Sequence, residues 1–195
     1  MGLWGASDAD ESKPKYLTTA EKKQVFATTK GWVREPDNAD QGNDNSAADP
    51  EVLVCIGDLT TSLGAATITS VEFVTTSIGA AAGGSISILI RWNEAVDVVE
   101  DGTGLKKYLT GSTTGALGKL RYASGTGTNE LTFTSVAAIA GGALTATETI
   151  TIDSGDPGLT YAGTTSVKDA GTSTTAEDVI TSAQSTAAGS LTVAS

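Results

Sequence analysis

The sequence contains no histidine, and this absence excludes many familiar catalytic designs. Histidine is the usual general base near neutral pH and the commonest transition-metal ligand in proteins. Ser-His-Asp and Cys-His arrangements are therefore excluded. We expect no catalytic residues, no metal site and no cofactor, and therefore a protein that is not an enzyme.

Cysteine and long apolar runs are also scarce. Cys55 is the only cysteine, so no internal disulfide can form, and its apolar neighbours predict a small core residue rather than a nucleophile. No apolar run approaches the roughly 18 to 20 residues that span a bilayer. An export signal needs an apolar run where this chain has Ser7, Asp8, Asp10 and Glu11, so we expect a soluble chain without such a signal.

Positive charge is limited as well. The chain has 12 basic and 23 acidic residues, for a net charge of −11. A surface that binds phosphate backbones needs clustered Lys and Arg, so we expect neither nucleic acid nor an anionic membrane as a partner. The acidic excess instead favours solubility in a crowded setting.

The larger part of the chain has the alternating pattern of β-strands. Residues 85–92 (SISILIRW) place Ile86, Ile88, Ile90 and Trp92 on one face. Turns rich in glycine separate short strands, and no helix is expected there. The strands are predicted at 68–76, 85–92, 95–99, 106–110, 119–123, 130–136, 148–153, 166–168 and 190–193.

The first third has a different organisation. Thr18 and Glu21 form a capping-box pattern and Gly31 is placed to end a helix, so we predict a helix over 19–30 after an extended arm. A polar linker, 35–50, and an apolar strand, 51–59, follow. The predicted fold is mainly β, an antiparallel Ig-like β-sandwich (65–195) preceded by an N-terminal module (1–60) with an extended arm, one short helix and a polar linker.

Two acidic patterns in the sequence allow a functional interpretation, one as a calcium site and one as an acid-base pair. The linker is rich in Asp and Asn, but an EF-hand alignment on Gly42 leaves Ala48 where the bidentate carboxylate belongs. Calcium binding there is left open but not expected. Glu94 and Asp97 lie three residues apart, so an extended strand would send them to opposite faces, and we expect a solvated strand edge rather than an acid-base pair.

Three stretches of the β-rich part carry a family resemblance. They are IRWNEAVDV (90–98), LRYASGTGTNELTF (120–133) and ITIDSGDPGLTYAGTTSVKD (150–169). Together they resemble the bacterial Ig-like repeats of large surface and adhesin-type proteins. The resemblance implies the fold of residues 68–176 and says little about function.

The front segment is similar to N-terminal modules of virion structural proteins of tailed phages, especially T4-like and marine cyanobacterial phages (cyanophages). The similarity rests on Trp4-Gly5, residues 8–17 (DADESKPKYL), Glu21-Lys22, residues 31–33 (GWV) and residues 51–57 (EVLVCIG). It implies a component of a virus particle. The expected function is a capsid decoration, or cement, protein on the virion surface, with a tail, neck or fibre component that contacts a host surface or glycan, or a bacterial surface adhesin fragment, as alternatives.

The expected partners are the major capsid protein and neighbouring copies of the chain, with a homotrimer as the expected oligomer. Large aromatic side chains have little interior to occupy in a thin module, so either they pack on the module itself or they anchor it to a neighbour. The predicted attachment residues are Trp4, Tyr16, Leu17, Phe26, Trp32 and Val33.

Overall fold

The computed structural model describes residues 13–14, 16–36, 48–55, 64–99, 104–110, 119–155, 159 and 165–195. Strands far outnumber helices in this part of the chain, which confirms the predicted mainly-β class. The elements are α1 (Thr19–Lys23), β1 (Val25–Thr28), β2 (Gly31–Arg34), β3 (Glu51–Cys55), β4 (Ile68–Phe73), β5 (Ile78–Gly79), β6 (Ser87–Val99), β7 (Lys106–Thr110), β8 (Lys119–Ser124), β9 (Thr128–Ser135), β10 (Thr149–Ile152), β11 (Ser166–Asp169), α3 (Ser182–Ala188) and β12 (Leu191–Ala194).

The strands are hydrogen-bonded along one path, in the order β3-β2-β1-β6-β9-β8-β7-β10-β12-β5, and β4 and β11 also pair with β6. Most neighbours are antiparallel, whereas β1 with β6 and β12 with β5 are parallel. This connected path supports the β class, and the Ig-like sandwich of two packed sheets stays a prediction. None of the helices in the described ranges is long and apolar enough to span a membrane.

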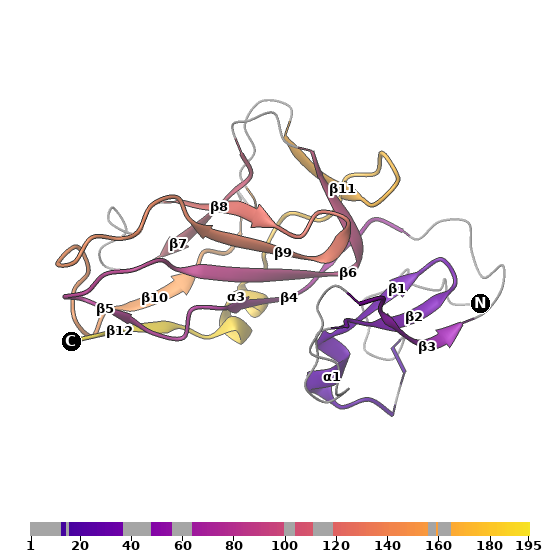
Figure 1. Ribbon diagram of the computed structural model, residues 1–195, viewed down its shortest axis with the longest axis horizontal. Coiled ribbons are helices and arrows are strands. Elements are labelled where there is room, and N and C mark those ends of the chain that lie inside the picture. Colours follow the sequence, from indigo (N-terminus) through magenta and orange to yellow (C-terminus); the bar gives the residue numbers. More distant parts are fainter. Residues whose placement is uncertain are drawn as a thin grey trace.

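Two hydrophobic cores lie along this path. The larger one draws on strands β4 to β12 and the segments between them, which we call the β-domain (described residues from 64 onward). The smaller one contains Leu17, Val25, Ala27 and Trp32, with Leu53 packed against it. We call this first part, described residues 13–55, the N-terminal lobe. Figure 1 shows the lobe at one end of an elongated molecule and β5 and β12 at the other.

Strand β6 is the longest strand and joins the two parts. It begins at Ser87 and so includes most of the strand predicted at 85–92 and all of the strand predicted at 95–99. It pairs with β1, β4, β9 and β11. Ile88, Ile90 and Trp92 are buried in the larger core, as the alternation predicts. The indole Nε1 of Trp92 donates to the carbonyl of Glu177 at 2.9 Å, so this buried polar group is satisfied.

The helix predicted over 19–30 is too long. The capping box of Thr18 and Glu21 forms, but α1 ends at Lys23, and Val25–Thr28 and Gly31–Arg34 make a β-hairpin. Val25 and Phe26 are β-branched or aromatic, and alternate residues of β1 are buried against the small core, which a strand achieves and a short helix does not. Gly31 therefore begins a strand instead of ending a helix.

Three other expectations are wrong. A helix, α3, forms in the β-rich part, where Thr181 and Gln184 make a second capping box. Cys55 is exposed rather than in a core. Glu94 is 5% exposed and lies opposite Ala27 of β1, so it is not on a solvated strand edge.

Gly31 is needed for the approach of β3 to β2. Its φ is +143°, and a Cβ at this position would lie 1.9 Å from the carbonyl oxygen of Val54. Gly84 has a similar φ of +141°, but there the nearest atoms would be 3.9 Å away. The two glycines thus share a backbone conformation and differ in the space around them.

We predict that Gly31→Ala costs roughly 2 to 4 kcal/mol of unfolding free energy, because a backbone penalty of about 1 to 2 kcal/mol adds to overpacking. The matched variant Gly84→Ala should show only the backbone penalty. Urea unfolding of the two variants and the parent protein measures the difference. Equal losses in both variants would contradict the packing role of Gly31.

Candidate functional site

The structure places the predicted attachment residues in different environments. Leu17, Trp32 and Val33 are buried, with 8%, 2% and 9% of their surface exposed, so they pack within the lobe and their burial does not support an attachment role. Phe26 is half-buried, whereas Tyr16 is 72% exposed. Trp4 lies outside the described residues. Among the described members of this set, Tyr16 is the most exposed.

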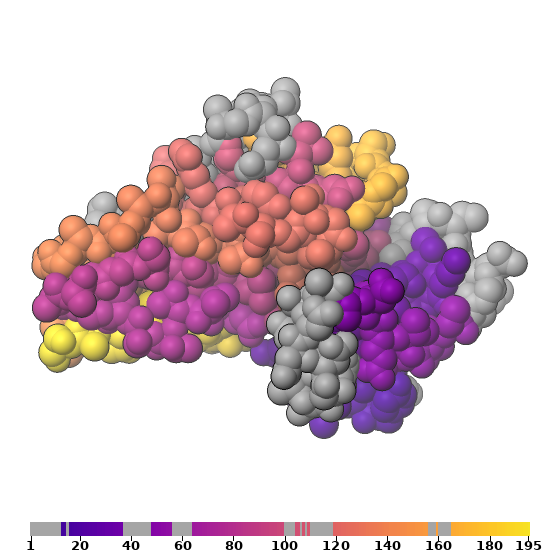
Figure 2. All heavy atoms as spheres, in the orientation of Figure 1, coloured from indigo at the N-terminus to yellow at the C-terminus, as the bar shows by residue number. Residues whose placement is uncertain are grey.

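The more informative sites lie where the lobe meets the β-domain. Strand β1 pairs with β6 through Ala27 and Glu94 alone. Figure 2 shows the lobe, in indigo and purple, lying against one end of the β-domain. Two groups of charged residues of opposite character lie at this junction.

The first group surrounds Arg91 of β6. Its guanidinium forms ion pairs with Glu72 of β4 and Glu130 of β9, and its Nε lies 3.5 Å from Oε1 of Glu35, which follows β2. Asn129 Nδ2 donates to the same Glu35 oxygen at 2.9 Å. One cation therefore links the lobe to two strands of the β-domain.

The environment changes the protonation of this group. Burial and the neighbouring Glu130 raise the pKa of Glu35 to about 7, against the opposing effects of Asn129 and Arg91. Burial lowers the pKa of Arg91, but Glu130, Glu35 and Glu72 together outweigh it and the net shift is upward. The arginine thus stays charged while Glu35 exchanges its proton near neutral pH.

A cavity of about 500 Å³ adjoins the Arg91 group. Two carboxyl groups beside a cavity raise the question of acid-base chemistry. A glycoside-cleaving pair needs carboxyls roughly 5 to 9.5 Å apart with the substrate between them. Here Glu35 shares a hydrogen bond with Glu130, and both carboxyls contact one guanidinium nitrogen. This arrangement suits a polar link between the two parts better than catalysis.

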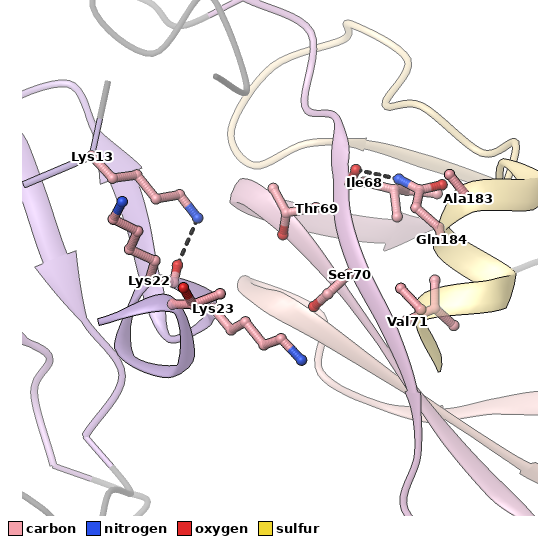
Figure 3. Close-up of a pocket in the computed structure, with 11 residues that line it drawn as sticks. Lys13, Lys22, Lys23, Ile68, Thr69, Ser70, Val71, Ala183 and Gln184 are labelled. Atoms are coloured by element: carbon pink, nitrogen blue, oxygen red, sulfur yellow. Dashed lines mark hydrogen bonds between the residues drawn. The ribbon is translucent and has the colours of Figure 1, made fainter. Parts of the chain in front are cut away.

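The second group is basic and lines a cavity of about 380 Å³ on another side of the junction. Lys13, Lys22 and Lys23 form the wall contributed by the lobe. Residues of β4 and α3 form the opposite wall, as Figure 3 shows. Lys13 is 7% exposed, and its Nζ donates to the carbonyl oxygen of Lys22 at 2.7 Å.

Neither group is evident from the sequence alone. The lysines were visible in KPK and EKK, but their opposite wall comes from residues 68–71 and 183–187, far along the chain. Among the residues that the structure describes, no group of three or more Cys, Asp or Glu side chains is arranged to hold a metal ion. The central part of the linker weighed for calcium, 37–47, lies outside those residues.

Comparisons of the chain with protein-family models, curated proteins and solved structures found no match. The sequence patterns and the geometry of the lobe and its junction therefore provide the basis for inferring a function.

The Glu35 carboxyl predicts a measurable pH dependence of stability. Because its pKa rises from 4.5 to about 7 on folding, the folded protein binds more protons in this window, and Glu35 reduces stability as pH rises through it. Glu35→Gln removes this titration. We expect the variant to be more stable than the parent at pH 8 by roughly 1 to 3 kcal/mol, since one pKa unit corresponds to about 1.4 kcal/mol.

Chemical denaturation at pH 5, 6, 7 and 8 tests this expectation. Glu51→Gln removes the same charge at an exposed position of β3 and controls for net charge. An unchanged difference between parent and Glu35→Gln across the four pH values would refute the assignment.

Proposed function

We propose that the chain is a non-enzymatic structural protein of a phage virion, a capsid decoration protein that binds the major capsid protein through its N-terminal part. The similarity of the front segment to N-terminal modules of virion proteins supports this proposal. The observation that carries it is the exposed outer edge of β3.

Strand β3 is the last strand of the path and pairs with β2 on one side only. Within the described ranges no strand pairs with its other side. Val52 is 60% exposed on this strand, and Cys55 at its end is exposed. An uncovered edge with apolar side chains is a template for strand addition by another chain, and soluble proteins usually protect such edges.

The arrangement of the molecule fits attachment at one end. In Figure 1, β3 lies on the outer side of the lobe, away from the β-domain. A partner strand on this edge would leave the β-domain free to project from the surface or to contact a neighbouring copy. Contacts with two subunits at once would slow their separation, because the second contact forms at high effective concentration. A homotrimer on the capsid surface is part of this proposal.

The charge of the chain supports a protein partner rather than the packaged genome. With a net charge of −11, non-specific association with nucleic acid is opposed by electrostatic repulsion. An interface built on backbone hydrogen bonds and a few apolar side chains does not need a basic surface. The exposed Tyr16 adds an aromatic side chain of the kind that often dominates binding energy.

Co-sedimentation with capsids that lack the protein, and separately with isolated tails, tests the proposal. Val52→Lys places a charge on the β3 edge and should weaken capsid binding about tenfold or more, equivalent to about 1.4 kcal/mol. Val136→Lys is the matched control, because Val136 is 56% exposed in the β-domain.

Two results would overturn the proposal. Binding of the parent protein to tails but not to capsids would exclude the decoration role. Equal binding of Val52→Lys and the parent to capsids would show that β3 is not the attachment edge.

A further inference from the structure

We propose that the basic cavity between the lobe and the β-domain binds a small multivalent oxyanion of the phosphate class. The cavity is lined by Lys13, Lys22 and Lys23 on one side and by residues of β4 and α3 on the other. This site goes beyond the attachment function and does not depend on it.

The residues that line the cavity favour a negatively charged ligand. The lining residues are Lys13, Thr19, Lys22, Lys23, Ile68, Thr69, Ser70, Val71, Ala183, Gln184 and Ala187, and no Asp or Glu is among them. A chain with 23 acidic residues thus gathers three of its 12 basic residues around one cavity without a carboxylate on its walls. An anion in the cavity would therefore lie near lysine side chains and meet no carboxylate among the lining residues.

The charge is held in place. The hydrogen bond from Lys13 Nζ to the carbonyl of Lys22 fixes the buried ammonium beside α1. Figure 3 shows this ammonium directed toward Thr69 across the cavity and Lys23 extending toward Ser70. Two positive groups from the lobe therefore face the hydroxyl-bearing strand of the β-domain. Lysine ammonium groups are common partners of phosphate oxygens in proteins.

Ser70 supplies a second, independent observation. Its hydroxyl is buried and has no hydrogen-bond partner, although it belongs to a residue that lines the cavity. A buried hydroxyl without a partner is costly and unusual in a folded protein. In Figure 3 the hydroxyl points toward the Lys23 side chain. An oxyanion bound between Ser70 and Lys23 would accept a hydrogen bond from this hydroxyl after the Lys23 side chain moves aside.

The size and setting of the cavity limit the ligand. At about 380 Å³ the cavity admits phosphate, pyrophosphate or a phosphate ester. A nucleic acid strand is disfavoured, because the lysines form one small cluster on an acidic chain rather than a continuous basic surface. A ligand that contacts both walls would also hold the lobe against the β-domain and raise the stability of the whole chain.

Thermal unfolding and titration calorimetry of the full chain with inorganic phosphate and with pyrophosphate test the site. Chloride at matched ionic strength is the reference. We expect the unfolding temperature to rise with pyrophosphate beyond the chloride effect, and Lys23→Gln to weaken pyrophosphate binding at least fivefold. Lys30→Gln is the matched control, since Lys30 is an exposed lysine of the same lobe outside the cavity lining.

Lys13 is buried and its replacement would disturb the fold, so the test uses the exposed Lys23 together with Ser70→Ala. Weaker binding in Ser70→Ala places the ligand against β4. A phosphoserine peptide compared with free phosphate distinguishes an ester on a partner from the free ion. No effect beyond chloride, or equal weakening in Lys23→Gln and Lys30→Gln, would overturn the proposal.

Discussion

The ion group around Arg91 is the interaction on which the placement of the lobe depends. Strand β6 directs Ile90 and Trp92 into the larger core and sends Arg91 to the opposite side. Because the inward residues fix β6 firmly, the guanidinium lies at a defined point where carboxylates from β4, β9 and the end of β2 converge. Replacing Arg91 would leave Glu72 and Glu130 crowded without their shared cation, which is far more costly than losing a surface ion pair.

The two charged groups give the junction an asymmetric character. Three carboxyls share one guanidinium on one side, and on the other Lys13 and Lys23 extend toward the hydroxyl-bearing residues of β4. The acidic side responds to protons, because burial and the neighbouring Glu130 raise the pKa of Glu35, whereas the basic side is suited to anions. The contact between the lobe and the β-domain is therefore sensitive to pH through Glu35 and suited to anions through its lysines, while β3 lies away from it.

Sequence patterns predicted the β-domain well, because its strands alternate between a core face and an outer face. Residues 106–110 form a strand as expected, and the capping box of Thr18 and Glu21 forms as predicted. The similar pattern of Thr181 and Gln184, which begins α3, was not predicted. The hairpin of β1 and β2 could not be predicted in the same way. A helix-capping pattern precedes it, and its buried residues pack against Leu53, which is distant in the sequence. The two charged groups could not be predicted either, because their members are distant in the sequence. Arg91 and Glu35, or Lys23 and Ser70, become neighbours only in the folded chain.

The parallel contact between β1 and β6 also has a mechanical consequence. One residue pair, Ala27 with Glu94, joins the lobe to the β-domain in the sheet. Few backbone hydrogen bonds between β1 and β6 would therefore resist a tensile load applied to the lobe. The load would pass into side chains, among them the Arg91 carboxylates and the bond from Asn129 to Glu35. Because the side chains of Arg91 and Glu35 are only 12% and 13% exposed, salt would weaken this contact far less than it weakens a surface ion pair.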